Sequence, residues 1–274
     1  MIPQNYQFAM DAGVYLLGVD SSEIGTRMPF DRGEIGDPAV FLIMGQSNGG
    51  NHGETRHRSE GRVFNFNPFD GLFYRASDPL LGATGTGGSP WCLLGDHLIK
   101  AGFARSVLFL PLCVGGATIK EWAPGGPYHH RMTFSIGRLR DAGLSPSHVL
   151  WHQGEADVLC GSSADEYVKS FWSLVDSLRR FNIDAPIYVA TATFFAIPKG
   201  YEARQMVIRK AQTSLIDPNR GIFRGPDTDL IRDRFDGCHL GDRGLRDHAR
   251  AWAKALIPSL STDSELAPGA LDTE

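Results

Sequence analysis

Hydrophobic runs alternate along this chain with longer segments in which apolar residues recur at helical spacing. Almost continuously apolar runs occupy residues 39–44, 107–113, 149–151 and 187–193, with a shorter one at 222–223. Continuous apolar runs are typical of parallel strands that helices cover on both faces. Helical spacing marks segments at 89–102, 130–142, 163–178, 203–215 and 242–257. The alternation predicts an α/β fold with an open, mostly parallel sheet of about five strands between helical layers.

The helix that follows Ser163 is the best defined by the sequence. Ser163 and Glu166 match a capping box, in which each side chain accepts a hydrogen bond from a free backbone N–H group. The apolar residues behind this box keep helical spacing: Val168, Phe171, Val175 and Leu178. Another helix is expected after Ser89 and Pro90, because serine is a common N-cap and proline suits the first helical position.

We expect one catalytic domain with a short extension at each end. Residues 1–38 are interpreted as an N-terminal extension packed on the domain, residues 39–261 as the domain, and residues 262–274 as a frayed tail. A strand or hairpin arm is expected at 13–20. Residues 48–88 are polar and glycine-rich, with scattered phenylalanine and tyrosine residues, which suggests a substrate-facing lid or wall.

Composition narrows the classes of partner. The 274 residues carry a net charge of −4, which offers no basic field for nucleic acid or an anionic membrane surface. A neutral or lightly charged small molecule is the more natural partner. Neither a leader-like start nor a run long enough to span a bilayer is present, so we expect a cytoplasmic protein.

The cysteines do not indicate a metal or disulfide framework. Cys92, Cys113, Cys160 and Cys238 lie far apart, without the Cys-x-x-Cys spacing of zinc sites. We interpret them as reduced core thiols. The loop residues His52, Glu54 and His57 also match no zinc motif, and we expect them in a solvated loop.

The apolar run at 39–44 stops at a turn that contains a serine. The residues from 41 to 50 read Phe-Leu-Ile-Met-Gly-Gln-Ser-Asn-Gly-Gly, so a buried strand ends abruptly and exposes Ser47. Gly116 and Gln153 likewise follow predicted strands. Because ligands bind at the carboxyl ends of parallel strands, we expect Ser47, Gly116 and Gln153 to meet at one edge of the sheet.

These residue types fit acyl transfer. A serine hydroxyl needs a base, which a third group must orient, and donors for the oxyanion that develops. We expect Ser47 to attack, His239 to take its proton, and Asp236 to hold the imidazole in the right tautomer. The N–H groups of Ser47 and Gly116 and the side-chain amide of Gln153 are the expected oxyanion donors.

Several neighbouring residues leave alternatives open. Glu155 is a rival to Asp236 as the partner of His239, although the three-residue spacing favours Asp236. Otherwise Glu155 and Asp157 either brace the turns or are loop charges.

Aromatic and polar residues near the turns raise a second set of alternatives. Asn48 and Trp122 are assigned to substrate binding, and Trp122 and Tyr128 either stack on a sugar or pack internally. Cys238 is expected to be a packed thiol rather than a nucleophile. His248 is expected in the core or in an interface.

Taken together, these motifs resemble the SGNH (GDSL-like) hydrolases, in particular the branch of sialate O-acetylesterases and acetylxylan esterases. The matching blocks are Gly45-Gln46-Ser47-Asn48, Gly115-Gly116 with Ile119 and Trp122, Trp151-His152-Gln153-Gly154-Glu155-x-Asp157, and Asp236-x-x-His239-Leu240. The resemblance implies a flavodoxin-like three-layer fold, a serine mechanism without metal or cofactor, and removal of acetyl or other short acyl groups from sugar hydroxyls. It also implies that Gln153 replaces an oxyanion asparagine of more distant relatives.

Two departures from the family pattern affect the expected function. Gly49 stands where an apolar side chain is common, so we expect more space beside the nucleophile. Many relatives are exported, whereas no export signal is visible here. An intracellular deacetylation step, or an O-acyltransferase on the same scaffold, is therefore an alternative to keep open. A non-catalytic carbohydrate-binding relative is a separate alternative to an O-acetylesterase that acts on a saccharide or small-molecule ester.

Overall fold

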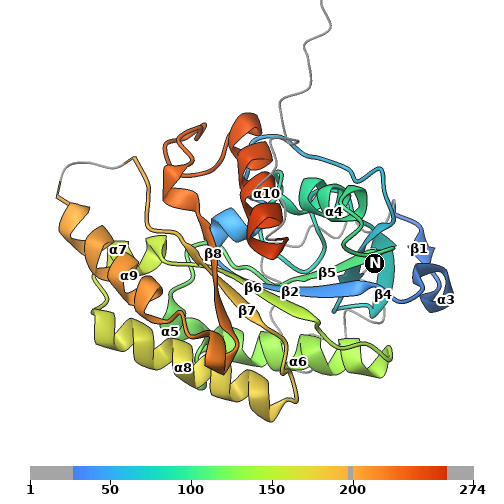
Figure 1. Ribbon diagram of the computed structural model, residues 1–274, viewed down its shortest axis with the longest axis horizontal. Helices are drawn as coiled ribbons and strands as arrows, with labels where there is room; N and C mark the ends of the chain where they lie inside the picture. Colours follow the sequence, from blue (N-terminus) through green and yellow to red (C-terminus); the bar gives the residue numbers. More distant parts are fainter. Residues whose placement is uncertain (1–26, 197–199, 258–274) are drawn as a thin grey trace, which may run out of the picture.

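The strand that precedes Ser47 lies near the middle of a single sheet. The computed structural model describes residues 27–196 and 200–257. In this part of the chain the sheet has eight strands in the order β1-β4-β3-β5-β2-β6-β7-β8 (Figure 1). Their bounds are Pro29–Phe30 (β1), Ala39–Gly45 (β2), Val63–Asn67 (β3), Leu72–Arg75 (β4), Val107–Pro111 (β5), His148–His152 (β6), Ile187–Thr191 (β7) and Ile222–Asp227 (β8).

The sheet is larger than the sequence predicts. The pairs from β3 through β5, β2, β6 and β7 to β8 are parallel, while β4 and β1 add an antiparallel edge. The expected lid at 48–88 contains β3 and β4, and its Phe64, Phe66 and Phe73 lie in the core. Strand β3 was not expected because it contains two asparagines, which are buried. The side chain of Asn65 forms hydrogen bonds with the backbone N–H and C=O of Leu81 instead of facing solvent.

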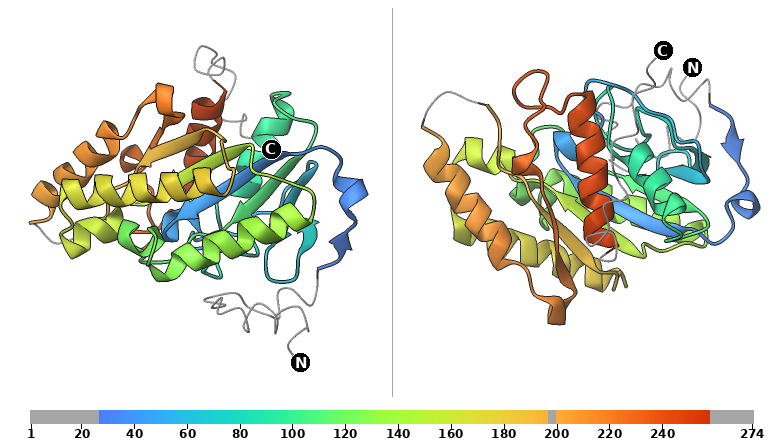
Figure 2. Two further views of the ribbon diagram at one scale, coloured as in Figure 1. Left: turned by 90° about the horizontal axis from the view of Figure 1, so that it is seen from below. Right: turned by 45° about the horizontal axis from the view of Figure 1, so that its top comes forward.

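Helices cover both faces of the sheet, as predicted. Helices α4 (Trp91–Lys100) and α10 (Asp242–Leu256) lie on one face (Figure 1). The other face carries α5 (Ile119–Trp122), α6 (Pro127–Asp141) and α8 (Ala164–Arg180), as Figure 2 shows from below. Helices α7 (Glu155–Cys160) and α9 (Glu202–Ser214) pack on each other, and α3 (Arg32–Ile35) precedes β2.

The side chains of β2 divide the core in two. Val40, Leu42 and Met44 belong to the cluster on the α6 and α8 face, whereas Phe41 and Ile43 belong to the cluster with α4 and α10. This alternation follows from the two-residue repeat of a strand, and it explains why β2 reads as continuously apolar. The predicted capping box is confirmed, since Ser163 accepts a hydrogen bond from the Glu166 N–H at the start of α8.

The ends of the chain and the cysteines differ in part from expectation. Strand β1 pairs with β4, so part of the expected N-terminal extension is an edge strand of the sheet. The strand expected at 13–20 and the tail at 262–274 lie outside the described residues. All four cysteines are free, but only Cys92 and Cys113 are buried. Cys160 is exposed, so the prediction of a core thiol is wrong for this residue, whereas Cys238 is half-buried and packs against the core.

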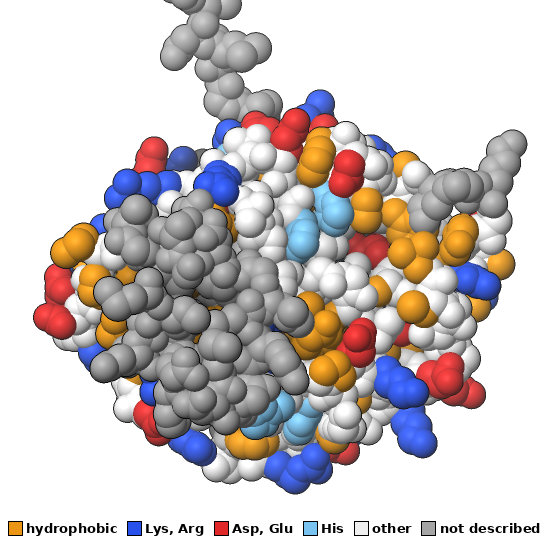
Figure 3. Space-filling view, turned by 180° about the vertical axis from the view of Figure 1, so that it is seen from behind, with side chains coloured by type: hydrophobic (Ala, Val, Ile, Leu, Met, Phe, Trp, Pro, Cys, Tyr) orange, Lys and Arg blue, Asp and Glu red, His pale blue; other side chains and the backbone are white. Residues whose placement is uncertain are grey.

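Two further observations concern the outside of the molecule. None of the helices within residues 27–196 and 200–257 is long and apolar enough to cross a bilayer. On the face in Figure 3, basic and acidic side chains are interspersed over the coloured surface.

Candidate active site

Ser47 begins a short 3-10 helix, η1 (Ser47–Gly49), directly after β2. The turn is possible because Gly45 has φ +135°, and a Cβ there would lie 1.9 Å from the backbone oxygen of His152 on β6. Only glycine allows the two strands to approach so closely at this point. The Gln46 N–H donates to the same His152 oxygen over 2.9 Å. The Ser47 turn is therefore fixed to the ends of two central strands.

Asp236 and His239 form a hydrogen-bonded pair in the loop before α10. The Asp236 Oδ1 accepts from the N–H groups of Cys238 and His239, at 2.8 and 2.6 Å. Its Oδ2 lies 2.6 Å from the His239 Nδ1. Gly237, with φ +82°, lets the chain reverse between them. The three-residue spacing thus orients the imidazole within one turn, with Nδ1–H on the carboxylate and Nε2 left as a proton acceptor.

The charge state of Asp236 suits this arrangement. Partial burial would raise its pKa, but the hydrogen bonds from the backbone and ring of His239 and from the Cys238 N–H outweigh burial and lower the pKa to about 2. Asp236 is thus a carboxylate at neutral pH. The rival partner, Glu155, accepts from Asn48 at 2.9 Å instead, so the structure pairs His239 with Asp236.

Asn48 joins the serine turn to the histidine loop. Its Nδ2 donates to the Glu155 Oε1 at 2.9 Å and to the Cys238 carbonyl at 3.3 Å. The Cys238 carbonyl also accepts from the Arg234 Nη1 at 2.5 Å. Both hydrogens of the Asn48 amide are thus used inside the protein, so the structure gives this amide a bracing contact, and the assignment of Asn48 to substrate binding stays a prediction. Glu155 accepts one of these hydrogen bonds, and its complete burial raises its pKa to about 7.

Gln153 does not offer its amide as the sequence suggests. The side chain is fully buried, and its Nε2 donates to the Ala117 carbonyl at 3.1 Å and to the Asp157 Oδ2 at 2.5 Å. Asp157 also accepts from the Ile119 N–H at 2.9 Å. In this conformation Gln153 and Asp157 therefore support the chain after Gly116. These two hydrogen bonds are compatible with the alternative in which Asp157 braces a turn.

Two backbone N–H groups remain for an oxyanion. Neither the Ser47 N–H nor the Gly116 N–H donates to an acceptor within residues 27–196 and 200–257. Gly116 is exposed and has φ +72°, and nothing lies within 4 Å of a Cβ added there. The turn therefore presents open backbone at the carboxyl end of β5, where a ligand can approach it.

His52 lies in the site, which the sequence did not reveal. Its ring stacks on that of His239 with 5.4 Å between centroids and 24° between planes. The expectation of a solvated loop is therefore wrong for this residue, although Glu54 is exposed. The surrounding glycines were a usable signal, because a half-buried ring in a glycine-rich loop needs close backbone approach. Within the described residues, no group of three or more His, Cys, Asp or Glu residues could hold a metal ion.

Comparison with known proteins identifies the family. The family described as "Carbohydrate esterase, sialic acid-specific acetylesterase" matches residues 37–258, which is most of the chain. The chain belongs to this family. A probable carbohydrate esterase of Arabidopsis thaliana is 32% identical over 106 residues, but the aligned part spans only 39% of this chain and 39% of that relative.

Solved structures of other proteins share the fold of this family member. An Arabidopsis thaliana protein is similar with a TM-score of 0.65 and 22% identity, over 82% of this chain and 99% of that one. The acetylxylan esterase Axe2 of Geobacillus stearothermophilus is similar with a TM-score of 0.54 and 15% identity, over 81% and 95%. These likenesses support the α/β fold of the SGNH type that the resemblance implies.

Trp122 of this carbohydrate esterase family member is a core residue. It is fully buried, and its Nε1–H donates to the Gly45 carbonyl at 3.2 Å. Our assignment of Trp122 to substrate binding is therefore wrong, because no face of the indole is open to a sugar. Tyr128 is half-buried and packs on it with 5.5 Å between ring centroids. The exposed aromatic residue beside His239 is instead Phe235, 51% exposed, whose ring centroid lies 6.3 Å from that of His239.

Three more expectations concern the packing of residues in and near the site. A Cβ at Gly49 would lie 2.9 Å from the Cys113 Sγ and 3.3 Å from the His152 Cβ, so the space beside Gly49 is filled, not widened. His248 is fully buried and accepts from the Trp252 Nε1–H at 2.9 Å, which confirms it as a core histidine. The Cys238 thiol has its pKa raised to about 11 by burial, as expected for an unreactive cysteine.

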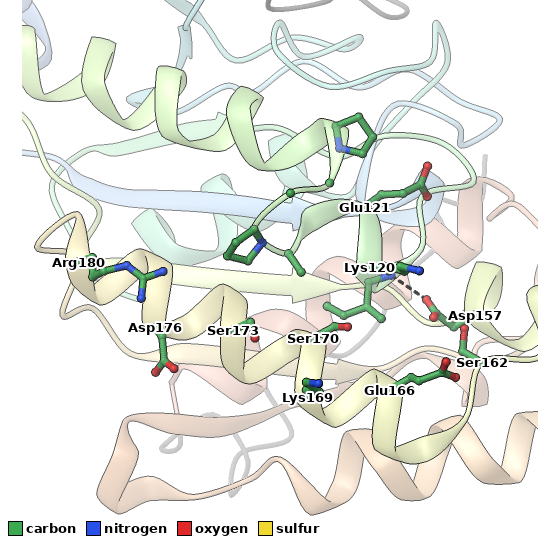
Figure 4. A pocket seen from close by; sticks show the side chains of 16 residues that line it. Lys120, Glu121, Asp157, Ser162, Glu166, Lys169, Ser170, Ser173, Asp176 and Arg180 are labelled. Atoms are coloured by element: carbon green, nitrogen blue, oxygen red, sulfur yellow. Dashed lines mark hydrogen bonds between the residues drawn. The ribbon is translucent and has the colours of Figure 1, made fainter.

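A separate groove of about 770 Å³ lies between α5 and α8 (Figure 4). Asp157 and Ser162 lie at one end of the groove, and Asp176 and Arg180 lie at the other. The dashed line marks the hydrogen bond that Asp157 accepts from the Ile119 N–H. Ser47 and His239 do not line this groove, so we do not take it as the reacting site.

Proposed function

We propose that this protein is a serine carboxylester hydrolase that removes acetyl or other short acyl groups from a carbohydrate through an acyl-enzyme. The observation that carries the proposal is the Asp236–His239 pair, whose loop is tied to the serine turn by Asn48. Family membership supports the substrate class, as does the acetylxylan esterase among the similar structures. Serine hydrolases on unrelated folds use the same arrangement, in which a carboxylate orients a histidine and the histidine activates a serine.

In acylation, the Ser47 Oγ forms a bond to the acyl carbon while its proton passes to the His239 Nε2. The imidazolium then protonates the sugar oxygen as the ester C–O bond breaks. Asp236 keeps the ring in the Nδ1–H tautomer and stabilises its positive charge. In deacylation, His239 takes a proton from water, the hydroxyl adds to the acyl carbon, and the proton returns to Ser47 with release of the acid.

Negative charge that develops on the acyl oxygen would be met by the N–H groups of Ser47 and Gly116. Each free N–H donor of this kind is worth roughly 3 to 4 kcal/mol in transition-state stabilisation. We assign Gln153 and Asp157 to holding the Gly116 turn, because their polar groups are bonded to each other and to the Ala117 carbonyl and the Ile119 N–H.

We assign the sugar side of the site to Phe235. An exposed phenyl face next to the base suits the C–H faces of a pyranose. Phe235→Ala should raise the KM for an acetylated saccharide at least several-fold and leave the KM for ethyl acetate unchanged. Equal effects on the two esters would contradict this assignment.

The main test compares Ser47→Ala with Ser214→Ala, a control at the exposed end of α9. On a chromogenic acetate ester, Ser47→Ala should lose roughly 10³-fold or more of kcat while remaining folded, and Ser214→Ala should match the wild type. Asp236→Asn should lower kcat by up to about 10⁴-fold, because the amide disfavours the required tautomer. Unchanged turnover in a folded Ser47→Ala protein would reject the proposal.

A labelling experiment and a product analysis separate the proposal from its alternatives. A fluorophosphonate should label Ser47 stoichiometrically, whereas a non-catalytic carbohydrate-binding protein would not react. With acceptor sugars present, a hydrolase yields only free acid. A new ester as the main product would establish an acyltransferase instead.

A further inference from the structure

The ring of His52 lies against the base and is enclosed by backbone. It follows the serine turn in sequence and stacks on His239 with 5.4 Å between ring centroids. A Cβ at Gly85 would lie 2.8 Å from the His52 Cδ2, and a Cβ at Gly115 would lie 2.9 Å from its Cε1. Contacts this short are not tolerated by real side chains, so the two glycines leave a slot that fits the imidazole.

His52 is also bonded to the turn that carries Gly116. Its Nε2 lies 3.0 Å from the Thr84 Oγ1, and that hydroxyl accepts from the Gly115 N–H at 2.8 Å. The Thr84 backbone is fixed as well, since its N–H donates to the Cys113 carbonyl and its carbonyl accepts from the Asn51 N–H, both at 2.9 Å. A chain of contacts thus runs from His239 through His52 and Thr84 to the Gly115–Gly116 turn.

We propose that His52 is a positioning residue, which holds the plane of the His239 ring and couples it to the Gly115–Gly116 turn that receives the oxyanion. The proposal rests on the proposed function, because it concerns the same reaction. Asp236 fixes the His239 ring at Nδ1 but leaves rotation about that hydrogen bond, and a ring stacked on the flat face restricts this rotation. Misplacement of a reacting group by about 1 Å can cost 100-fold in rate.

The electrostatics of the slot are compatible with this role. Burial, followed by the charge of His239, lowers the pKa of His52 to about 4, although Asp236 acts in the opposite direction. His52 is therefore neutral at the pH at which esters are hydrolysed. A neutral ring shields one face of His239 from water and does not repel the imidazolium that forms during acyl transfer.

The test uses two substitutions that separate the ring from the hydrogen bond. His52→Gln keeps a polar group that can reach Thr84 but removes the ring. Its kcat on a chromogenic acetate ester should fall about 10- to 100-fold with little change in KM. The acid limb of its kcat/KM profile should also move, because water then reaches the face of the base that the His52 ring covers. His52→Phe keeps a ring and should retain more of kcat than His52→Gln.

A matched control and a measurement on the wild type complete the test. His57→Gln, in the same loop but paired with Asp242 at 3.2 Å, should change neither kcat nor the acid limb. In the wild type, the carbon-bound ring protons of His52 and His239 should show a nuclear Overhauser effect. Its absence would overturn the proposal even if a variant fails to fold.

The outcomes distinguish the proposed role of His52 from the proposed esterase function on which it rests. A folded, fully active His52→Gln protein would overturn the role of His52 and leave the esterase proposal intact. A fall in kcat with an unmoved acid limb and a matching loss of thermal stability would show a merely structural role, which also overturns it. An inactive wild type whose ring protons still show the Overhauser effect would instead refute the esterase function.

Discussion

Glu155 offers a direct test of the electrostatics beneath the site. Its carboxyl group is fully buried, with Oε1 accepting from the Asn48 Nδ2 at 2.9 Å and Oε2 without a hydrogen-bond partner in the described residues. Burial raises its pKa from an ordinary value of 4.5 to about 7. Glu155→Gln keeps the shape and the acceptor for Asn48 but removes the ionisation. The variant therefore isolates the cost of a buried negative charge.

The size and sign of the effect follow from the two pKa values. A gap of about 2.5 pH units corresponds to about 3 kcal/mol, because each unit is worth about 1.4 kcal/mol. Since the folded state binds the proton more tightly than the unfolded state, Glu155 lowers the free energy of unfolding as pH rises from about 4.5 to about 7. Above that range the full cost applies. The free energy of unfolding of Glu155→Gln should not show this decrease.

The assay is urea denaturation of both proteins at several pH values from 4.5 to 8. Glu155→Gln should match the wild type near pH 4.5 and exceed its free energy of unfolding by about 3 kcal/mol near pH 8. Glu60→Gln, which replaces an exposed glutamate, should follow the wild type throughout. If the curves of Glu155→Gln and wild type run parallel over this range, the buried charge does not have the cost that we assign to it.

Three further predictions concern residues packed around the turns. Trp122→Phe removes a hydrogen bond to the Gly45 carbonyl and should cost about 1–2 kcal/mol in urea denaturation without a change in KM, whereas a raised KM would restore a substrate contact. Gly49→Ala should cost about 1–3 kcal/mol by overpacking against Cys113. Combined with Cys113→Ala it should cost less than the sum of the single changes, and strict additivity would argue against the contact. Gly116→Ala should cost about 1–2 kcal/mol in thermal unfolding, because its φ of +72° disfavours a side chain, and full stability would contradict that conformation.

The sequence predicted those parts of the molecule that depend on interactions between residues close together in the chain. The apolar runs located the central strands, and helical spacing with a capping box located the helix after Ser163. The Asp236–His239 spacing identified a pair that one turn brings together. Strand β3 was not predicted, because Asn65 and Asn67 are typical loop residues. In the structure their side-chain amides donate hydrogen bonds within the fold. Phe64 and Phe66 do alternate with these asparagines, but an alternation this short among loop-like residues is a weak signal for a strand.

Contacts between distant segments account for most errors in the site. Nothing near Asn48 in the sequence shows that its amide will reach Cys238, which lies 190 residues further on. The same holds for Trp122 and Gln153, whose burial depends on how other segments cover them. An aromatic or amide side chain beside a glycine turn is equally compatible with a substrate contact and with a brace, and only the packing decides.

One half of the site is more deeply buried than the other. Ser47 and the Gly116 turn lie at the ends of central parallel strands, and Ser47 is 5% exposed. The pair on the other side is far more open, with side-chain exposures of 25% for His239 and 39% for Asp236. Local geometry can orient the imidazole toward Asp236, but it cannot set the distance from the imidazole to Ser47. Asn48 and His52 make contacts across the site that bear on this distance. In the mechanism that we propose, catalysis would therefore depend on side chains that need not touch the substrate.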